Sequence, residues 1–326
     1  MFAIPQETNC FTDPAYDELV FHVGPEGDFT SLTACLIALQ GESRPKTVYV
    51  AGGEYDIYRE YREANVPRCA PDYTDIHNYM PYVVLVPPRT KIIGQGNVVL
   101  RYTPSAEETY VPESKMVSPL NVSATAYVEN MTVICRNGRY CLHDETLGMP
   151  EFSGAEKRYK NVRFIRSEEN DPGLGFSSVL GAGFDDKMQF TFEDCVFEND
   201  IPNTAGRKAN SFYMHNRMRD KKGKIYTFAN SSRVFVRNCH ILGKGRAVKF
   251  GNCSTLIQHI PVVFEDCLIE GEILVSDEAK KTGLKPNSYD LRFIGCGPVK
   301  PLSAHTCEPF PAQVDQSERS RYQPVE

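Results

Sequence analysis

The sequence predicts an all-β protein, a single-stranded parallel β-helix with an amphipathic helix at its N-terminal end. Two observations support this prediction: a pattern of short strand-like segments repeats irregularly along the chain, and each copy carries a bend-forming residue at the same position. The composition is that of a globular protein, since 41% of the 326 residues are hydrophobic and 24% are charged. No run of 18 or more apolar residues occurs, so membrane insertion is not expected.

Six segments of the chain share the repeated pattern. In each segment, a bend-forming residue is followed by a small or medium-sized apolar residue, and the flanking residues alternate as they do in strands. Consecutive copies are 31, 33, 44, 28 and 29 residues apart, so the connecting loops must differ in length. The bend column holds Asn130, Asn161, Asp194, Asn238, Asp266 and Gly295, and the column after it holds Met131, Val162, Cys195, Cys239, Cys267 and Cys296.

Both columns have a physical explanation in a solenoid. Asn, Asp and Gly tolerate left-handed backbone angles better than other residues, so a column of them predicts the same sharp bend in every coil. The residue after the bend then points inward, where Val, Met and reduced Cys fit between stacked coils. A β-propeller or a β-sandwich is the competing interpretation, but either would need more regular blades or hairpin turns such as Asn-Gly.

The cysteines fit the same interpretation. Their number, 11, is odd and no CxxC pair occurs, so neither a disulfide framework nor a zinc site is predicted. Four of them lie in the inward column after the bend. We expect these four to form a ladder of buried, free thiols.

The N-terminal part supplies the cap that a solenoid needs. Residues 28–41 have the spacing of an amphipathic helix. We expect Asp28 or Thr30 to cap the start of this helix and Gly41 to follow its end. The apolar face of the helix consists of Leu32, Cys35, Leu36 and Leu39.

The chain is expected to divide into three parts. Residues 1–44 form the N-terminal segment with the capping helix, residues 45–308 form the β-helix, and residues 309–326, rich in Pro, Gln, Ser and charge, form a flexible tail. Long insertions interrupt the coils. They are expected at about 54–82 and 201–230, with the first strands at 47–50, 83–86 and 91–94.

Two stretches of the chain resemble the pectin lyase-like β-helix superfamily and, within it, the pectin methylesterases. Residues 27–32, 48–55 and 92–96 are similar to the capping helix and first coil of such proteins. Residues 237–267, which include Phe250-Gly251-Asn252, are similar to the esterase stretch that places a nucleophilic Asp three residues before Phe-Gly-Asn. The resemblance and the general crossover rule both imply a right-handed helix.

The catalytic motif of the esterases is broken in this chain. Ala247 occupies the position of the nucleophile and can neither attack an ester nor act as a base, and no match to the Gln-Asp motif is present. Pectin methylesterase activity is therefore not expected. The chain also resembles the irregular β-helices of phage tail fibres and tailspikes, which implies a polysaccharide or cell-surface glycan as ligand and a homotrimer as assembly.

A second strand is expected in each coil. If Leu142, Leu180, Met214, Phe250 and Val275 point inward, alternation sends their neighbours outward. One outward column then holds His143, Gly181, His215, Gly251 and Ser276, and the column beside it holds Cys141, Val179, Tyr213, Lys249 and Leu274.

This outward face carries the candidate site. A histidine can act as a general base near neutral pH, and glycoside hydrolysis needs two carboxylates roughly 5 to 10 Å apart. Lyase chemistry instead needs a base and a cation that stabilises the substrate carboxylate. The catalytic candidates are His143, Asp144, Asp185, Asp186 and His215, and the ligand-binding candidates are Tyr213, Asn216, Arg217 and Lys249.

Each candidate also has a purely structural interpretation. Asp144 and Asn216 follow strands and can close bends, and an outward histidine can be an ordinary surface residue. The basic run 217–224 reads as a solvated loop tip. No HxH or HExxH spacing occurs, so neither a metal site nor a cofactor is expected.

The sequence as a whole favours a glycan-engaging β-helix protein associated with a phage or prophage tail. A carbohydrate-active enzyme, either a glycoside hydrolase or a polysaccharide lyase, and a purely structural particle component remain the alternatives. The net charge of −6 argues against nucleic acid as a partner. The first ten residues lack a basic region followed by an apolar one, so we expect a cytoplasmic or virion-associated protein without a signal peptide.

Overall fold

The computed structural model describes most of the chain. The described residues are 17–66, 84–105, 118–145, 154–167, 176–184, 187–203, 208–216, 232–251, 253–254, 259–275, 285–286 and 288–297. The elements are β1 (Leu19–Val23), α1 (Leu32–Ala38), β2 (Lys46–Asp56), α2 (Ile57–Glu63), β3 (Leu85–Val86), β4 (Thr90–Tyr102), β5 (Leu120–Val122), β6 (Ala126–Arg136), β7 (Leu142–Asp144), β8 (Glu156–Ser167), β9 (Phe176–Phe184), β10 (Gln189–Glu193), β11 (Val196–Asn199), β12 (Lys208–Asn216), β13 (Arg233–Arg237), β14 (His240–Gly251), β15 (Cys253–Ser254), β16 (His259–Glu265), β17 (Leu268–Val275), β18 (Lys285–Pro286) and β19 (Ser288–Ile294).

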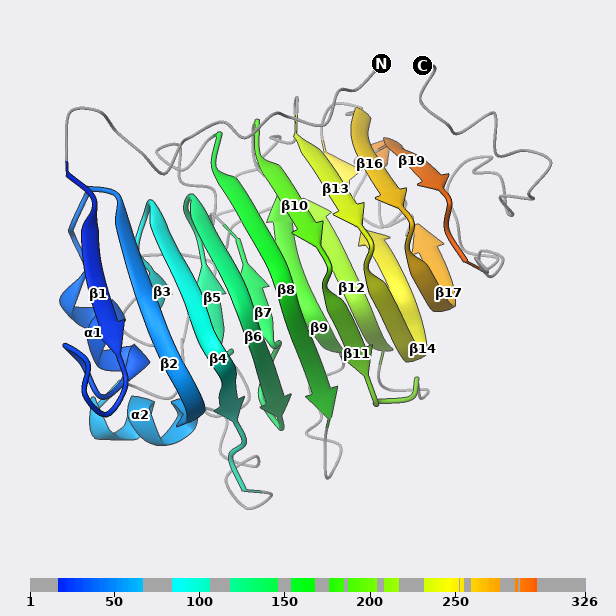
Figure 1. The fold of residues 1–326 in the computed structure, drawn as a ribbon. Helices are drawn as coiled ribbons and strands as arrows, with labels where there is room; N and C mark the ends of the chain where they lie inside the picture. Colours follow the sequence, from blue (N-terminus) through cyan, green and yellow to red (C-terminus); the bar gives the residue numbers. More distant parts are fainter. Residues whose placement is uncertain are drawn as a thin grey trace.

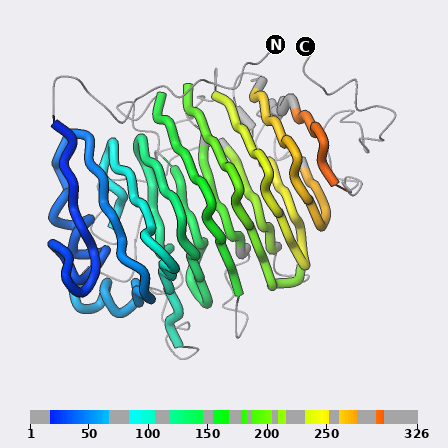
Figure 2. Tube along the Cα trace, in the orientation of Figure 1, coloured from blue at the N-terminus to red at the C-terminus, as the bar shows by residue number. Residues whose placement is uncertain are grey.

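The strands stack into a parallel β-helix, which confirms the predicted fold class (Figure 1). One line of parallel pairs runs β1–β2–β4–β6–β8 and continues as β10–β13–β16–β19. A second line runs β3–β5–β7–β9–β12–β14–β17. Figure 2 shows the coils following one another from blue to orange along the axis, and β15 and β18 form a separate antiparallel pair.

The predicted bend column is present in every one of its six positions. All six residues have left-handed backbone angles, with φ between 49° at Asn238 and 64° at Gly295. The bend divides each long strand into two arms, so that β8 pairs with β10 before its bend at Asn161 and with β11 after it. At the last position a Cβ atom at Gly295 would lie 2.1 Å from Asp266 Oδ1, so a larger residue there would require the Asp266 side chain to shift.

The residues after the bend all point into the core, as predicted. Met131, Val162 and the four cysteines of this column are buried. The cysteines are free thiols in the structure. Aromatic rings stack between coils beside this column, with centroids 5.0 Å apart for Tyr159 and Phe192 and 5.1 Å apart for Phe264 and Phe293. Stacked apolar columns of this kind supply the stability of a solenoid.

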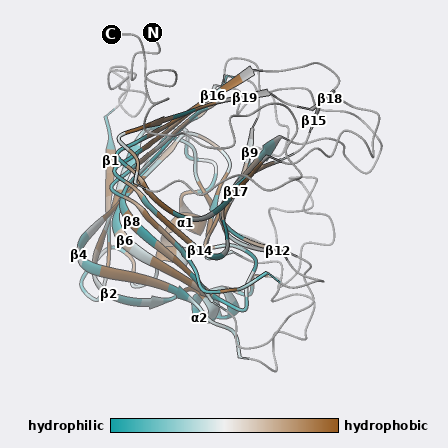
Figure 3. Ribbon diagram, turned by 90° about the vertical axis from the view of Figure 1, so that its right-hand side faces the viewer, coloured by the Kyte–Doolittle hydropathy of each residue, from teal (hydrophilic) through white to brown (hydrophobic). Residues whose placement is uncertain are grey.

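The predicted cap is present, but its first residue differs from the expectation. Ser31, and neither Asp28 nor Thr30, is the N-cap of α1, and its hydroxyl accepts a hydrogen bond of 3.2 Å from the Ala34 amide. Asp28 is engaged elsewhere, because its carboxylate accepts a hydrogen bond of 2.7 Å from the His22 amide. Seen along the stack in Figure 3, α1 lies across the open end of the coils. Its predicted apolar face is buried and consists of Leu32, Cys35, Leu36 and Leu39.

Several boundaries differ from the sequence-based expectation. The first coil begins with β1, which lies inside the segment 1–44 that was expected to precede the β-helix. The helix α2 forms in the expected insertion 54–82. Asp56 caps its start by accepting a hydrogen bond of 3.0 Å from the Arg59 amide. The range expected as the insertion 201–230 contains β12. Residues 67–82 and the expected tail 309–326 lie outside the described residues. In the described part, no helix is long and apolar enough to cross a membrane.

Candidate functional site

The candidate site lies on the outer face of β7, β9, β12 and β14, which run side by side. His143 pairs with Gly181, Gly181 with Tyr213, and Tyr213 with Lys249. The expected column that aligned His143 with His215 is therefore wrong by two residues, and His215 pairs with Gly183 and Gly251 instead. Side chains in a strand alternate with period two, so a slip of two leaves every side chain on its predicted face and cannot be detected from the pattern.

Glu145 connects the two histidines of this face. Its Oε1 atom lies 2.7 Å from His215 Nε2, and its Oε2 atom lies 3.6 Å from His143 Nε2. The Glu145 amide donates to the carbonyl of Val122 in β5, which fixes the backbone directly after β7. The side chain of His143 is 2% exposed, whereas Glu145 and His215 are 11% and 14% exposed. A ligand can therefore reach Glu145 and His215 but not His143.

Two glycines in β9 make the connection possible. Glu145 follows β7 and His215 lies in β12, so the carboxylate must pass over β9, which lies between them. A Cβ atom at Gly183 would lie 2.8 Å from Glu145 Cγ, and one at Gly181 would lie 2.6 Å from the ring of Tyr140. Any larger residue at either position would displace these side chains. The glycines thus leave room for the Glu145 chain and the Tyr140 ring to lie flat over β9.

An aromatic ring packs against each of the two histidines, and a cation lies over each of these rings. The rings of Tyr213 and His215 stack with centroids 5.0 Å apart, and Lys249 Nζ lies 4.7 Å from the centre of the Tyr213 ring. On the buried side, the Arg139 guanidinium lies 4.7 Å from the centre of the Tyr140 ring. Such cation–π contacts hold positive charge close to an aromatic face. We call the group Arg139, Tyr140, His143, Glu145, Tyr213, His215 and Lys249 the outer-face cluster.

The electrostatics of the cluster distinguish its members. Burial and the nearby Arg139 guanidinium lower the pKa of His143 to about 4, so this imidazole is neutral near pH 7. Burial by itself would raise the pKa of Glu145, but the two nearby histidines, above all His215 at 2.7 Å, hold it well below its ordinary value. Glu145 is thus an ionised carboxylate in contact with the accessible imidazole of His215, and such a pair can bind a hydroxyl group or move a proton.

Asp144 does not belong to this face, contrary to the sequence-based expectation. It points into the core with no exposed side-chain surface, and its carboxylate contacts Lys157 Nζ and the Tyr159 hydroxyl. Burial raises the pKa of Asp144 despite these two partners. Lys157 Nζ also lies 5.5 Å from the centre of the Phe190 ring. Because Asp144 stands between His143 and Glu145 in the chain, its anchorage in the core turns both neighbours outward.

The other candidates have mixed outcomes. Tyr213, His215 and Lys249 lie on the predicted face, where the Tyr213 ring contacts both of the others. Asp185, Asp186 and Arg217 lie outside the described residues, as does the side chain of Asn216, whose backbone ends β12. Among the residues that the structure describes, no group of three or more His, Cys, Asp and Glu side chains is arranged to hold a metal ion.

Sequence reasoning missed Glu145, Arg139 and Tyr140. The signal for Glu145 was its position two residues after His143, which puts both on the same face if the extended backbone continues past the strand. Arg139 and Tyr140 precede β7 in an irregular segment, where alternation predicts nothing. That segment is fixed by Arg166, which donates to the Gly138 carbonyl at 2.7 Å.

Comparisons with known proteins add little to this geometry. No protein-family model matches the chain, and no curated protein matches it. Among solved structures, the chain is similar to a "1,3-alpha-1,4-beta-D-galactose-4-sulfate-3,6-anhydro-D-galactose-2-sulfate 4 galactohydrolase", with a TM-score of 0.37, 10% identity, and coverage of 89% of this chain and 72% of that one. A likeness at this level carries no argument about function, which must come from the site itself.

Proposed function

We propose that the outer-face cluster binds a polysaccharide that lies along the axis of the β-helix, across β7, β9, β12 and β14. The observation that carries the proposal is the continuous row formed by Glu145, His215, Tyr213 and Lys249, which crosses four coils and takes side chains from three of them. An aromatic face accepts the apolar C–H face of a sugar ring, while the carboxylate, imidazole and ammonium groups bind hydroxyl and acidic substituents. This chemistry also agrees with the resemblance to the pectin lyase-like superfamily.

A panel of soluble polysaccharides and their oligomers tests this proposal. The panel includes neutral, uronic-acid and sulfated chains, and binding is measured by calorimetry. Tyr213→Ala should weaken binding of the preferred glycan at least roughly tenfold, because it removes the stacking surface. Tyr49→Ala is the matched control, since Tyr49 also stacks on a histidine, His22, with ring centroids 5.6 Å apart but on another part of the fold. Equal losses in both variants, or no binding to any member of the panel, would contradict the proposal.

Polysaccharide cleavage is a second candidate function, favoured by the contact between Glu145 and His215. Elimination next to a uronic acid carboxylate needs a base and a cation, and His215 and Lys249 offer these groups. Hydrolysis that relied on Asp144 is not supported, since that carboxylate lies in the core. The enzyme proposal predicts unsaturated products from a uronic-acid polysaccharide, detected by ultraviolet absorbance, and their loss in His215→Ala. Absence of cleavage with binding retained would leave glycan binding as the function.

The remaining expectations extend this proposal to the setting of the protein. We propose association with a phage or prophage tail, with a homotrimer as the assembly, a virion-associated or cytoplasmic location and no nucleic-acid partner. The molar mass in solution, measured by light scattering, tests the assembly. A strict monomer would contradict the tail-associated trimer while leaving glycan binding by the outer-face cluster open to its own test.

A further inference from the structure

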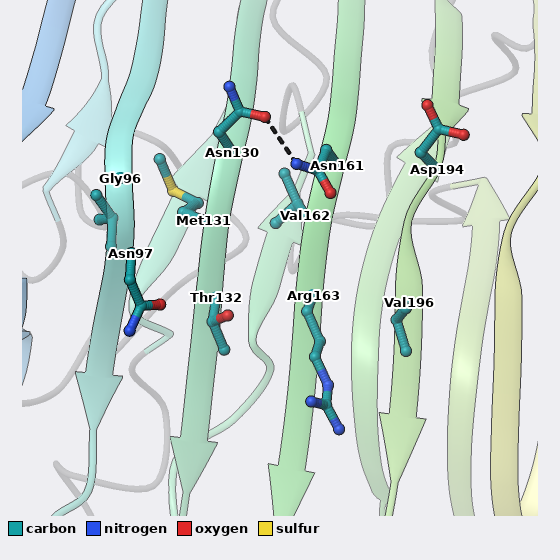
Figure 4. Close-up of a pocket in the computed structure, with 11 residues that line it drawn as sticks. Gly96, Asn97, Asn130, Met131, Thr132, Asn161, Val162, Arg163, Asp194 and Val196 are labelled. Carbon is teal, nitrogen blue, oxygen red and sulfur yellow. Dashed lines mark hydrogen bonds between the residues drawn. The ribbon is translucent and has the colours of Figure 1, made fainter. Parts of the chain in front are cut away.

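A groove runs along the bends of β4, β6, β8 and the β10–β11 coil, away from the strands that carry the outer-face cluster. It has a volume of about 310 Å³ and is drawn in Figure 4. One end is formed by Gly96 and Asn97, where β4 has an irregular register between Ile93 and Val99 and a left-handed angle of φ 90° at Gly96. The polar side chains that line the groove belong to Asn97, Asn130, Thr132, Asn161, Arg163 and Asp194.

The bend residues form a ladder of hydrogen bonds that is interrupted inside this groove. Asn161 Nδ2 donates to Asn130 Oδ1 at 2.8 Å, and Asn238 Nδ2 donates to Asp194 Oδ1 at 2.6 Å. Both donors point toward the preceding coil, so the next rung would require Asp194 to donate to Asn161. A carboxylate has no proton to donate. Among the described contacts no hydrogen bond joins Asn161 and Asp194, and two acceptors line the middle of the groove.

This arrangement calls for a ligand with donors of its own. Thr132 and Asn97 make no side-chain hydrogen bond with any described residue, so a hydroxyl group and an amide are also available to a ligand. Arg163 supplies a cation at the rim, where it pairs with Glu198 at 2.7 Å. The lining charges, Arg163 and Asp194, cancel. A neutral molecule rich in hydroxyl groups, each able to donate and to accept, fits this set better than an anion does.

The repeat of the coils favours a linear polymer. Thr132, Arg163 and Val196 pair with one another in consecutive coils, which follow at the strand spacing of about 4.8 Å. A pyranose unit in a linear chain has a length close to this spacing, whereas an extended peptide advances about 3.3 Å per residue. We propose that this groove binds a segment of a neutral, linear oligosaccharide, whose hydroxyl groups bridge Asn161 and Asp194.

The substitution Asp194→Asn tests this proposal with little risk to the fold. Asparagine already occupies the same column, in the same backbone conformation, at Asn130, Asn161 and Asn238. The new amide can donate to Asn161 and complete the ladder, which removes the pair of acceptors. Binding of neutral hexasaccharides of glucose, mannose or galactose, followed by nuclear magnetic resonance titration of the full chain, should weaken roughly tenfold.

Two controls separate this groove from the outer-face cluster. Asp266→Asn changes the same residue type in the same column and φ range but outside the groove lining, and should leave the affinity unchanged. In a Tyr213→Ala background, in which the outer-face cluster has lost its stacking ring, Asp194→Asn should still weaken the binding. Failure of all the neutral hexasaccharides to bind at millimolar concentration, or wild-type affinity in Asp194→Asn, would overturn the proposal.

Discussion

Glu145 Oε1 lies 2.7 Å from His215 Nε2, although the strand β9 separates the two coils that carry these residues. The contact depends on Gly183, because its missing side chain leaves the path across β9 open. A site that bridges two coils in this way is built from three segments that lie far apart in the sequence. Glu145 contributes the carboxylate, Gly183 the gap over β9, and His215 the imidazole.

The first prediction concerns that gap. Gly183→Ala places a Cβ atom 2.8 Å from Glu145 Cγ. Because Cγ is close to the Glu145 backbone, a rotation of the outer part of the Glu145 side chain cannot relieve this contact. We expect the carboxylate to leave His215 and glycan affinity to fall as much as in Glu145→Gln, measured by calorimetry. A wild-type affinity in Gly183→Ala combined with a large loss in Glu145→Gln would contradict the packing argument.

The second prediction concerns the pH dependence of stability. Burial and Arg139 lower the pKa of His143 from 6.5 to about 4, so between these values the unfolded chain binds a proton that the folded protein does not bind. Stability should therefore fall as the pH decreases from 6.5 toward 4, by about 3 kcal/mol for this group. Urea unfolding at several pH values measures it.

The matched variants are His143→Asn and His22→Asn. His143→Asn should lose less stability than the wild type over the same pH range, and His22→Asn, at a side chain that is 56% exposed, is the control for replacing a histidine outside the core. Identical profiles for the wild type and His143→Asn would show that His143 is not buried as a neutral imidazole.

The third prediction concerns the buried pair beneath the site. Lys157→Met leaves the Asp144 carboxylate in the core without its cation, which should lower the free energy of unfolding by about 3 to 5 kcal/mol. The double variant Lys157→Met with Asp144→Leu should lower the free energy of unfolding less than Lys157→Met alone does. Denaturant titration of the single and double variants measures the coupling.

An exposed ion pair provides the comparison for that experiment. Arg59 and Glu63 pair at 2.7 Å but are 74% and 62% exposed, so Arg59→Met should lower the free energy of unfolding far less than Lys157→Met does. A cost for Lys157→Met no larger than for Arg59→Met would mean that Asp144 is not held in the core by this contact.

The fourth prediction concerns the thiols. Within the described part of the chain, seven cysteines are buried and free, and four of them form the column Cys195, Cys239, Cys267 and Cys296. Burial, together with the neighbouring thiols, raises the pKa of Cys239 well above its ordinary value, which suppresses the reactive thiolate. A thiol reagent should therefore label at most four of the 11 cysteines rapidly in the folded protein and all free thiols after denaturation. Rapid native labelling of Cys239, located by mass spectrometry, would contradict the stacked core.

The fold could be predicted because one residue per coil determines the bend. Asn130 and its five equivalents are confined to residue types that accept a left-handed angle, and this restriction is visible in the sequence. The N-cap of α1 was predicted at the wrong residue because Asp28, Thr30 and Ser31 are all competent caps. The contact of Asp28 with the His22 amide, which removes Asp28 from this role, joins residues outside the helix and is not part of the helical pattern.

The site could be predicted only in part, for a different physical reason. Alternation placed His143, Tyr213, His215 and Lys249 on the outer face correctly, but it carries no information about register in steps of two residues. For Asp144 the sequence-based prediction is wrong for another reason. Its polar character suggested a place on the surface, whereas Lys157 and Tyr159, which lie on another strand, stabilise it in the core. The alternation of residues within one strand cannot predict contacts with side chains on strands that are distant in the sequence.

The most direct test of the central claim is a crystal structure of the protein soaked with the oligosaccharide that binds most tightly in the panel. Binding by the outer-face cluster predicts a sugar ring packed on Tyr213, with hydroxyl or acidic groups within hydrogen-bonding distance of Glu145, His215 or Lys249. A well-ordered oligosaccharide seated elsewhere, with none on this face, would contradict it.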